Sequence, residues 1–221
     1  MSSASAGIIF DMDGVLCDSE DFMAEAGAAM FAETYRVTVQ PEEFRPFRGM
    51  GEDRYLGGVG KQHGITIRLP ADKNRAYEIF LHRIQGRLKP LPGALDFTQA
   101  CRQRGLKIAI ASSADRMKLL GMLPEIGLPL ERFDAVVTGS DVTHKKPHPE
   151  IFLTAAQLIG LPATQCVVVE DAASGVQAAK AAGCRCLALT TSLDAGTLRE
   201  LGADWIASDL AHVPREIGVS V

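Results

Sequence analysis

Gly7-Ile8-Ile9-Phe10-Asp11-Met12-Asp13-Gly14 starts as a continuous apolar run and ends in two acidic residues and a glycine. The apolar part is typical of a strand buried on both faces of a parallel sheet. Asp11 and Asp13 follow at its carboxyl end, and their i, i+2 spacing in extended chain points both side chains the same way. Two carboxylates so close repel each other unless a cation lies between them or one holds a proton. The stretch therefore predicts a buried parallel strand with a charged site at its end.

Similar short apolar runs recur along the chain, at residues 107–111, 135–137, 167–169 and 186–189. Helical patterns lie between them, and one helix is expected to stop at Gly105, where a missing Cβ tolerates a left-handed cap. Strand and helix alternate from residue 92 to about residue 207. This alternation predicts an α/β fold, a Rossmann-like doubly wound parallel sheet with right-handed crossovers.

Residues 17–89 break this alternation because they contain no convincing buried strand. Tyr77, Phe80, Leu81 and Ile84 instead form the i, i+3, i+4, i+7 stripe of a helix. We therefore predict an inserted α-helical cap domain over 17–89, and an α/β catalytic core domain formed by residues 1–16 and 90–221.

The composition excludes several classes of protein. The 221 residues are 47% hydrophobic and 23% charged, which is typical of a folded globular chain and not of a disordered one. The net charge of −4 predicts no attraction to nucleic acid or to anionic membranes. No apolar run approaches the roughly 20 residues of a membrane helix. We expect a soluble, cytoplasmic protein; its oligomeric state is left open, and a monomer is compatible with the sequence.

The chain has five cysteines and five histidines. The cysteines lie in or beside apolar segments without C-x-x-C spacing, so we predict that they are reduced and buried. The histidines show no ligand spacing either, and no zinc site is expected. The residues are Cys17, Cys101, Cys166, Cys184 and Cys186, and His63, His82, His144, His148 and His212.

A second acidic pair, Glu170-Asp171, follows the apolar run 167–169. The carboxyl ends of parallel strands meet at one edge of a sheet, so these two acids are expected beside Asp11 and Asp13. Four carboxylates from two strands can surround one hard cation, for which Mg²⁺ is the natural occupant. Alternatively, Asp171 caps the following helix, but a cap would not explain two acids at the end of a buried strand.

Hydroxyl and ammonium groups are expected at the same edge. Ser112 and Ser113 follow the apolar run 107–111 and could bind phosphate oxygens, although Ser112 taken alone would more often be a helix cap. Lys146 precedes Pro147 and a predicted helix. Beside a phosphoryl group and several carboxylates, a lysine supplies the positive charge that offsets both.

These motifs occur in a fixed order: Asp11-Met12-Asp13-Gly14, then Ser112, then Lys146 ahead of Pro147, then Glu170-Asp171. In this order the chain resembles the haloacid dehalogenase superfamily of phosphohydrolases over essentially its whole length. Within that superfamily it resembles the β-phosphoglucomutase-like branch, which carries a helical cap after the first motif. Residues 10–17 and 111–116 also resemble the hydrolase domain of the plant suppressor-of-quenching proteins.

The resemblance implies a Mg²⁺-dependent phosphatase acting on a small phosphorylated metabolite, such as a sugar phosphate. Asp11 would attack phosphorus to form an aspartyl-phosphate, while Asp13 would protonate the leaving alcohol and then deprotonate water. Asp11 and Asp171 would hold Mg²⁺ through their side chains and Asp13 through its backbone carbonyl. Glu170 would contribute directly or through water.

Substrate contacts are expected from the core and from the inserted segment. Gly14 and Ser113 lie in the motifs. Specificity is expected from the cap and from the loop after the second motif, where the candidates are Arg48, Glu52, Arg54 and Arg116. A surface arginine is more often solvated or paired with an acid, so each of these is weak individually.

Two other functions compete with hydrolysis. The first is a sugar-phosphate mutase, but the β-phosphoglucomutases carry a histidine where this chain has Met23 and a lysine where it has Asp115. The second is a non-enzymatic, phospho-accepting signalling or binding domain. In receiver domains of that kind the phosphorylated aspartate follows a middle strand, whereas here the acidic pair follows the first one. A phosphatase is therefore the favoured interpretation.

Overall fold

The computed structural model describes residues 6–48 and 51–219. Its centre is a parallel sheet with the strand order β3-β2-β1-β4-β5-β6. The strands are β1 (Gly7–Phe10), β2 (Lys107–Ala111), β3 (Ala135–Val137), β4 (Cys166–Glu170), β5 (Arg185–Leu189) and β6 (Trp205–Ala207). β1 lies between β2 and β4, and Ile8 is in register with Ile108 on one side and Val167 on the other. The predicted Rossmann-like α/β fold is confirmed.

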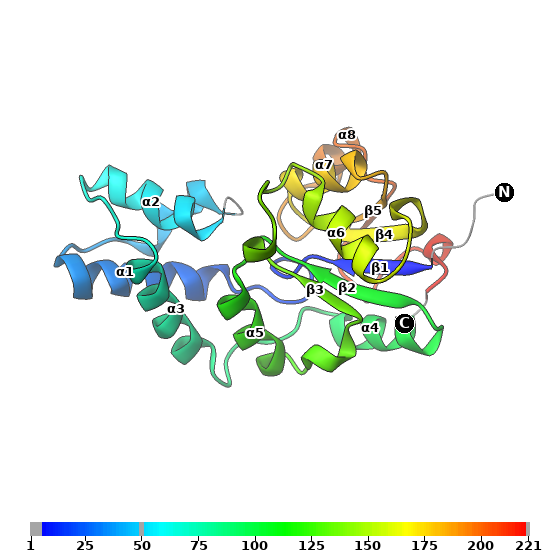
Figure 1. The fold of residues 1–221 in the computed structure, drawn as a ribbon, viewed down its shortest axis with the longest axis horizontal. Helices are drawn as coiled ribbons and strands as arrows, with labels where there is room; N and C mark the ends of the chain where they lie inside the picture. The colour runs from blue at the N-terminus through cyan, green and yellow to red at the C-terminus, as the bar shows by residue number, and fades with distance from the viewer. Residues whose placement is uncertain (1–5, 49–50, 220–221) are drawn as a thin grey trace.

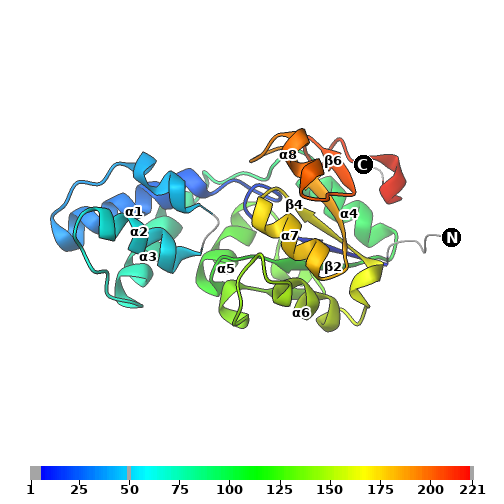
Figure 2. The same cartoon turned by 90° about the horizontal axis from the view of Figure 1, so that it is seen from above.

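Helices cover both faces of the sheet (Figure 1, Figure 2). α4 (Ala94–Gln103) and α5 (Arg116–Glu125) pack on the face that carries Phe10, where the Phe10 and Phe97 rings meet edge to face at 6.1 Å. The opposite face, which carries Ile9, is covered by α6 (Glu150–Leu158), α7 (Ala173–Ala181) and α8 (Ala195–Glu200). Because both faces are buried, the strands are apolar except at their ends, where Lys107, Glu170 and Arg185 lie.

The inserted segment, residues 17–89, is helical and lies beyond one end of the sheet (Figure 1). It contains α1 (Glu20–Tyr35), the 3₁₀ turn η1 (Pro41–Phe47), α2 (Glu52–Gln62) and α3 (Ala71–Ile84). The two chain crossings into it lie side by side, since Leu91 N–H donates to Leu16 O at 2.9 Å. That residues 17–89 act as a separate cap domain stays a prediction.

Some elements were not predicted from the sequence, and others begin within one residue of the predicted position. β4 and β5 each begin one residue before the predicted apolar run, and the three-residue β6 and the helices α5 and α8 were not singled out. All five cysteines are buried and free, as predicted. Within the described residues, no helix combines the length and the apolar character needed to cross a membrane.

Candidate active site

Three neighbouring strands bring the predicted groups to one edge of the sheet. Asp11 follows β1, Ser112 follows β2, and Glu170 is the last residue of β4. Asp11 N–H still donates to Val169 O at 3.0 Å, and Ser112 N–H to Val137 O at 3.1 Å, so the sheet pairing fixes both backbones. Because β1 lies between β2 and β4, the three residues meet where the strand order reverses direction, the usual ligand site of such sheets.

Lys146 lies between carboxylates from two strand ends. Its Nζ is 2.6 Å from Asp11 Oδ1 and 2.6 Å from Glu170 Oε1, and it donates to Ala111 O at 3.2 Å. Burial disfavours the ammonium charge, but the two carboxylates outweigh burial and raise the pKa of Lys146 above its ordinary value. Lys146 is therefore a fixed positive charge beside Asp11.

Two of the acids at this edge hold a proton more readily than ordinary aspartates. Burial raises the pKa of Asp11 to about 7, with the Glu170 charge adding to the rise and Lys146 opposing it. Burial and then the Glu170 charge raise the pKa of Asp171 to about 8, although Ser192 O–H donates to its carboxylate. The edge therefore carries more negative charge than Lys146 alone can balance.

Asp13 lies in a different environment from Asp11. Its Oδ1 accepts hydrogen bonds from the backbone N–H of Ser19, at 3.1 Å, and from the Ser19 hydroxyl, and its Oδ2 is 3.0 Å from Lys118 Nζ. Burial acts to raise the pKa of Asp13, but Lys118 and Ser19 outweigh it, so the pKa lies below its ordinary value. Environments that push two neighbouring carboxyl pKa values apart suit them to different roles.

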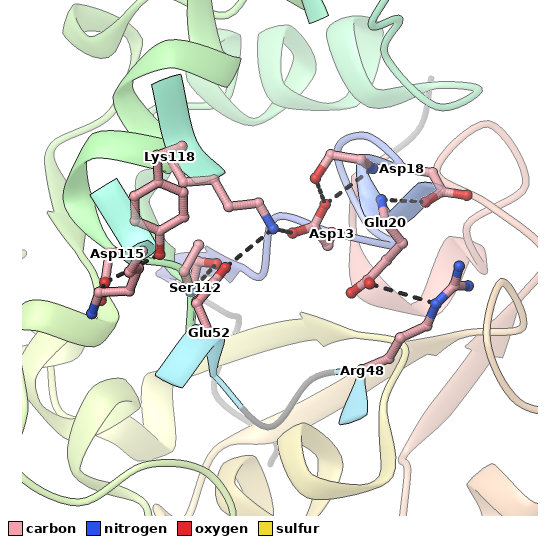
Figure 3. A network of polar contacts seen from close by, with 12 residues as sticks. Asp13, Asp18, Glu20, Arg48, Glu52, Ser112, Asp115 and Lys118 are labelled. Atoms are coloured by element: carbon pink, nitrogen blue, oxygen red, sulfur yellow. Dashed lines mark hydrogen bonds and ion pairs between the residues drawn. The ribbon is translucent and has the colours of Figure 1, made fainter. Parts of the chain in front are cut away.

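A cavity of about 650 Å³ joins these groups to the inserted segment. Figure 3 shows Lys118 between Asp13 and Glu52, with Glu20 and Arg48 facing each other close by. The predicted site residues in the cavity wall are Asp11, Asp13, Gly14, Arg48, Glu52, Ser112, Ser113, Lys146, Glu170 and Asp171.

The comparisons with known proteins agree with this geometry. A family model described as haloacid dehalogenase-like hydrolase matches residues 6–183. This chain belongs to the haloacid dehalogenase-like hydrolases. The resemblances seen in the sequence, to the β-phosphoglucomutase-like branch and to the suppressor-of-quenching proteins, are confirmed.

Three relatives illustrate the family. Protein SUPPRESSOR OF QUENCHING 1, chloroplastic, of Arabidopsis thaliana is 42% identical over 214 residues, which is 94% of this chain but only 20% of that protein. This chain thus spans about a fifth of that relative. A phosphorylated carbohydrates phosphatase of Thermotoga maritima is 33% identical, covering 89% of this chain and 91% of the relative. The crystal structure of CbbY from Rhodobacter sphaeroides in complex with phosphate has a TM-score of 0.83 at 25% identity, covering 94% and 95% of the two chains.

The residues of this haloacid dehalogenase-like hydrolase fit a bound Mg²⁺. The candidate ligands are the side chains of Asp11 and Asp171, the backbone carbonyl of Asp13, and Glu170 directly or through water. All are hard oxygen donors, which Mg²⁺ prefers. The raised pKa values of Asp11 and Asp171 reflect burial and repulsion between carboxylates, which a divalent cation would relieve.

Two glycines leave room for these acids. A Cβ on Gly14, whose φ is +76°, would lie 1.9 Å from Asp171 Oδ2, and a Cβ on Gly175 would lie 1.7 Å from Glu170 Oε1. The backbone after β1 and the first turn of α7 can therefore pack directly against the two carboxylates only because these positions lack a side chain.

The helix-cap alternatives for two of the site residues do not hold. Asp115, not Ser112, occupies the N-cap position of α5, and Ser112 Oγ accepts the N–H of Ala114 at 3.2 Å. Ala172 occupies the N-cap position of α7. It is Glu170 Oε2, not Asp171, that accepts N–H groups there, from Asp171 at 2.9 Å and from Ala172 at 3.0 Å.

Two of the residues predicted to contact the substrate lie away from the cavity. Arg54 and Arg116 are exposed and lie outside the cavity wall. Each helical residue is rotated by about 100° from its neighbour, so the face that turns to the cavity excludes them. On α2 that face carries Glu52 and Tyr55, and on α5 it carries Lys118.

Lys118 is the main residue that the sequence did not reveal. It lies six residues after Ser112, in the first turn of α5, and only 4% of its side chain is exposed. Its Nζ is 3.0 Å from Asp13 and 3.4 Å from Glu52, so it links the first motif to the inserted segment. A lysine in a helix normally predicts a solvated side chain; the buried apolar face of α5 was the only available signal.

The turn that carries Lys146 is held by Glu150. Its carboxylate accepts the N–H groups of Thr143 at 2.8 Å and His144 at 2.9 Å, and it lies 2.8 Å from His144 Nδ1. His144, His148 and Glu150 gather within 4.8 Å, a grouping that their sequence spacing did not predict. Hydrogen bonding within the turn accounts for this grouping.

Proposed function

We propose that this chain is a Mg²⁺-dependent phosphatase that hydrolyses a monoester of a small phosphorylated metabolite, such as a sugar phosphate. The observation that carries the proposal is the position of Lys146 Nζ, 2.6 Å from both Asp11 and Glu170 at the carboxyl edge of the sheet. A carboxylate can attack a phosphate dianion only if positive charge offsets their repulsion, and Lys146 provides part of it.

Asp11 is the proposed nucleophile. Its carboxylate oxygen bonds to phosphorus while the bond from phosphorus to the ester oxygen breaks, leaving an aspartyl-phosphate and an alcohol. Asp13 gives its proton to the departing oxygen. Asp13 then takes a proton from water, the water oxygen bonds to phosphorus, and Asp11 is released with inorganic phosphate.

Asp13 must hold a proton for the first step, although Lys118 and Ser19 lower its pKa in the free protein. A phosphate dianion entering the cavity adds negative charge beside Asp13, and nearby negative charge favours the protonated carboxyl. Substrate binding is thus expected to load Asp13 with the proton that it later donates.

Mg²⁺ held by Asp11, Asp171 and the Asp13 carbonyl would neutralise the carboxylates and the phosphoryl oxygens. Ser112 and Ser113 would bind phosphoryl oxygens through their hydroxyl and N–H groups. Residues 17–89 would form the cap that controls the access of water. The adjacent crossings at Leu16 and Leu91 mean that the chain enters and leaves such a cap at one place.

Water is favoured over a second sugar hydroxyl as the phosphoryl acceptor. The cavity wall has Met23, an apolar side chain, where the mutases resembled have a histidine. The Asp115 carboxylate forms an ion pair with Lys73 at 2.7 Å and accepts hydrogen bonds from the hydroxyls of Tyr77 at 3.1 Å and Ser140 at 3.2 Å. Met23 has no proton to exchange, and Asp115 lies outside the cavity wall, so neither is placed to move a proton to or from a sugar bound at Asp11.

Phosphate release from p-nitrophenyl phosphate and from a panel of sugar phosphates, with Mg²⁺ present, tests the proposal. We expect turnover by the unsubstituted chain and a loss of about 10²-fold or more in Lys146→Met, because that substitution removes the charge beside the nucleophile. The neighbouring Lys145→Met, which lies outside the cavity wall, is the matched control. A folded protein that releases phosphate from none of these esters would contradict the proposal.

A further inference from the structure

The turn between β5 and α8, residues 190–194, is fixed at both ends. Thr190 N–H donates at 2.9 Å to the carbonyl of Ala207, the last residue of β6. At the other end Asp194 caps α8, because its carboxylate accepts two backbone N–H groups of the first turn at 2.8 and 3.1 Å. Three residues between these ends line the cavity, although they belong to none of the sequence motifs: Thr191, Ser192 and Leu193.

The two hydroxyl groups of this turn reach Asp171 and the backbone after β1. Ser192 O–H donates to Asp171 Oδ2. Thr191 O–H donates to Gly14 O at 2.6 Å, and its oxygen lies 3.4 Å from Asp171 Oδ2. A hydroxyl has one proton to donate, so the shorter contact, with Gly14, is the main hydrogen bond of Thr191. Ser192 therefore holds the Asp171 side chain, while Thr191 holds the backbone turn after β1.

These contacts restrict the orientation of the Asp171 carboxylate. The residue is 4% exposed, and Ser192 donates to it from one side. On another side a Cβ on Gly14 would lie 1.9 Å from Oδ2, so the backbone of that turn packs directly against the carboxylate. Because Ser192 and Thr191 both approach Oδ2, a cation held by Oδ1 would leave their contacts intact. Hydrogen bonds from residues outside the ligand set orient metal ligands in this way.

We propose, resting on the Mg²⁺-dependent activity proposed above, that Ser192 and Thr191 are positioning residues for the metal. Ser192 keeps the Asp171 carboxylate in the orientation that binds the cation. Thr191 fixes the Gly14 carbonyl, and with it the carbonyl of the preceding Asp13, the proposed backbone ligand. Both hydroxyls are engaged with protein oxygens, so they should act on Mg²⁺ affinity and not on the chemical step.

Calorimetric titration of Mg²⁺ into the metal-free chain, without substrate, tests this role. Ser192→Ala should weaken Mg²⁺ binding about tenfold, since loss of such a supporting hydrogen bond costs roughly 10–100-fold in metal affinity. Thr191→Val should also weaken it. Ser192→Thr keeps a hydroxyl at this exposed position and should restore most of the affinity. Ser208→Ala, whose hydroxyl bonds Asp209 outside the cavity wall, is the matched control and should bind Mg²⁺ as the unsubstituted chain does.

Phosphatase kinetics on p-nitrophenyl phosphate separate positioning of the metal from a general loss of structure. In Ser192→Ala the Mg²⁺ concentration for half-maximal activity should rise about tenfold, while kcat at saturating Mg²⁺ stays within about twofold. An unchanged Mg²⁺ affinity in this variant, or a fall in kcat that saturating Mg²⁺ does not reverse, would overturn the assignment and leave the phosphatase proposal intact.

Two further outcomes separate the assignment from the proposed function. If the unsubstituted chain binds no Mg²⁺, both the assignment and the proposed metal dependence are overturned. If Mg²⁺ binding weakens in Ser192→Ala as expected but the unsubstituted chain releases no phosphate, the assignment is supported and only the catalytic proposal is contradicted.

Discussion

The two walls of the cavity are built differently. The core wall consists of strand ends, where the sheet pairing fixes Asp11, Ser112 and Glu170, and where Lys146 joins two acids at 2.6 Å each. The wall from the inserted segment carries Arg48, whose side chain is 37% exposed, and Tyr55, whose hydroxyl has no hydrogen-bond partner among the described residues. The sheet fixes the groups of the core wall, whereas the helices of the inserted segment carry those of the other wall. This difference suggests that the strands provide the chemistry and the inserted helices select the substrate.

Among the variants that test this division, Asp11→Asn is expected to lower kcat the most. An amide cannot attack phosphorus, so kcat should fall about 10³-fold or more for every substrate, whatever its leaving group. Parallel kinetics on p-nitrophenyl phosphate and on a sugar phosphate measure this, with the exposed Asp96→Asn as the control. A loss of kcat for one substrate only would mean that Asp11 selects the substrate and does not attack phosphorus.

Removal of Mg²⁺ should come next in size. Dialysis against a chelator leaves Asp11, Asp171 and Glu170 facing the phosphate without a divalent charge, so kcat should fall about 10²-fold or more and return when Mg²⁺ is added. The measurement is turnover against free Mg²⁺ concentration. Full activity after exhaustive chelation would mean that the carboxylates of the core wall do not serve a metal.

Lys118→Met tests the contact between the two walls. The substitution removes the partner of Asp13 and leaves Glu52 buried without compensation, so kcat should fall about tenfold or more. Breaking a buried ion pair costs about 3–5 kcal/mol of stability, which denaturant unfolding would measure. Adding Glu52→Gln should restore much of the stability but not kcat. Recovery of both would show that Lys118 acts only through stability.

Glu150→Gln should have the smallest effect of these changes, a loss of stability that arises in the turn that carries Lys146. Backbone N–H groups, first that of Thr143, lower the pKa of Glu150 from its ordinary value of 4.5 to about 2. A lowered pKa in the folded state means that the charged form stabilises the fold fully above about pH 4.5 and that this contribution is lost as the pH falls through about 2. The variant should therefore melt lower than the unsubstituted chain at pH 7, with the difference closing toward pH 2. A constant difference across that range would contradict the role of the charge.

The core wall could be predicted because its signals are local. An apolar run followed at once by Asp11 or Glu170 specifies both the strand and the group at its end, and the rules of parallel sheets bring those ends together. No long-range information was needed to expect Ser112 beside Asp11.

The other wall could be predicted only in part, at Arg48 and Glu52, because the rest depends on the rotation of helices about their axes. Glu52 faces the cavity and Arg54 does not, although the sequence pattern treats both alike. Lys118 and Tyr55 were hidden for the same reason, since a lysine in a helix predicts a solvated side chain and a tyrosine predicts core. Only the packing of α2 and α5 decides which side chains enter the cavity.

Detection of a phosphoryl group on Asp11 tests most directly the claim that the core wall carries out the chemistry. In Asp13→Asn the general acid and base is missing, but p-nitrophenol is a good leaving group, so the first step should proceed and the second should stall. Rapid mixing with p-nitrophenyl phosphate should then give a burst of about one p-nitrophenol per protein, and peptide mass spectrometry should find the phosphoryl group on Asp11. A variant that releases p-nitrophenol steadily without a burst, with no phosphoryl group on Asp11, would contradict the account.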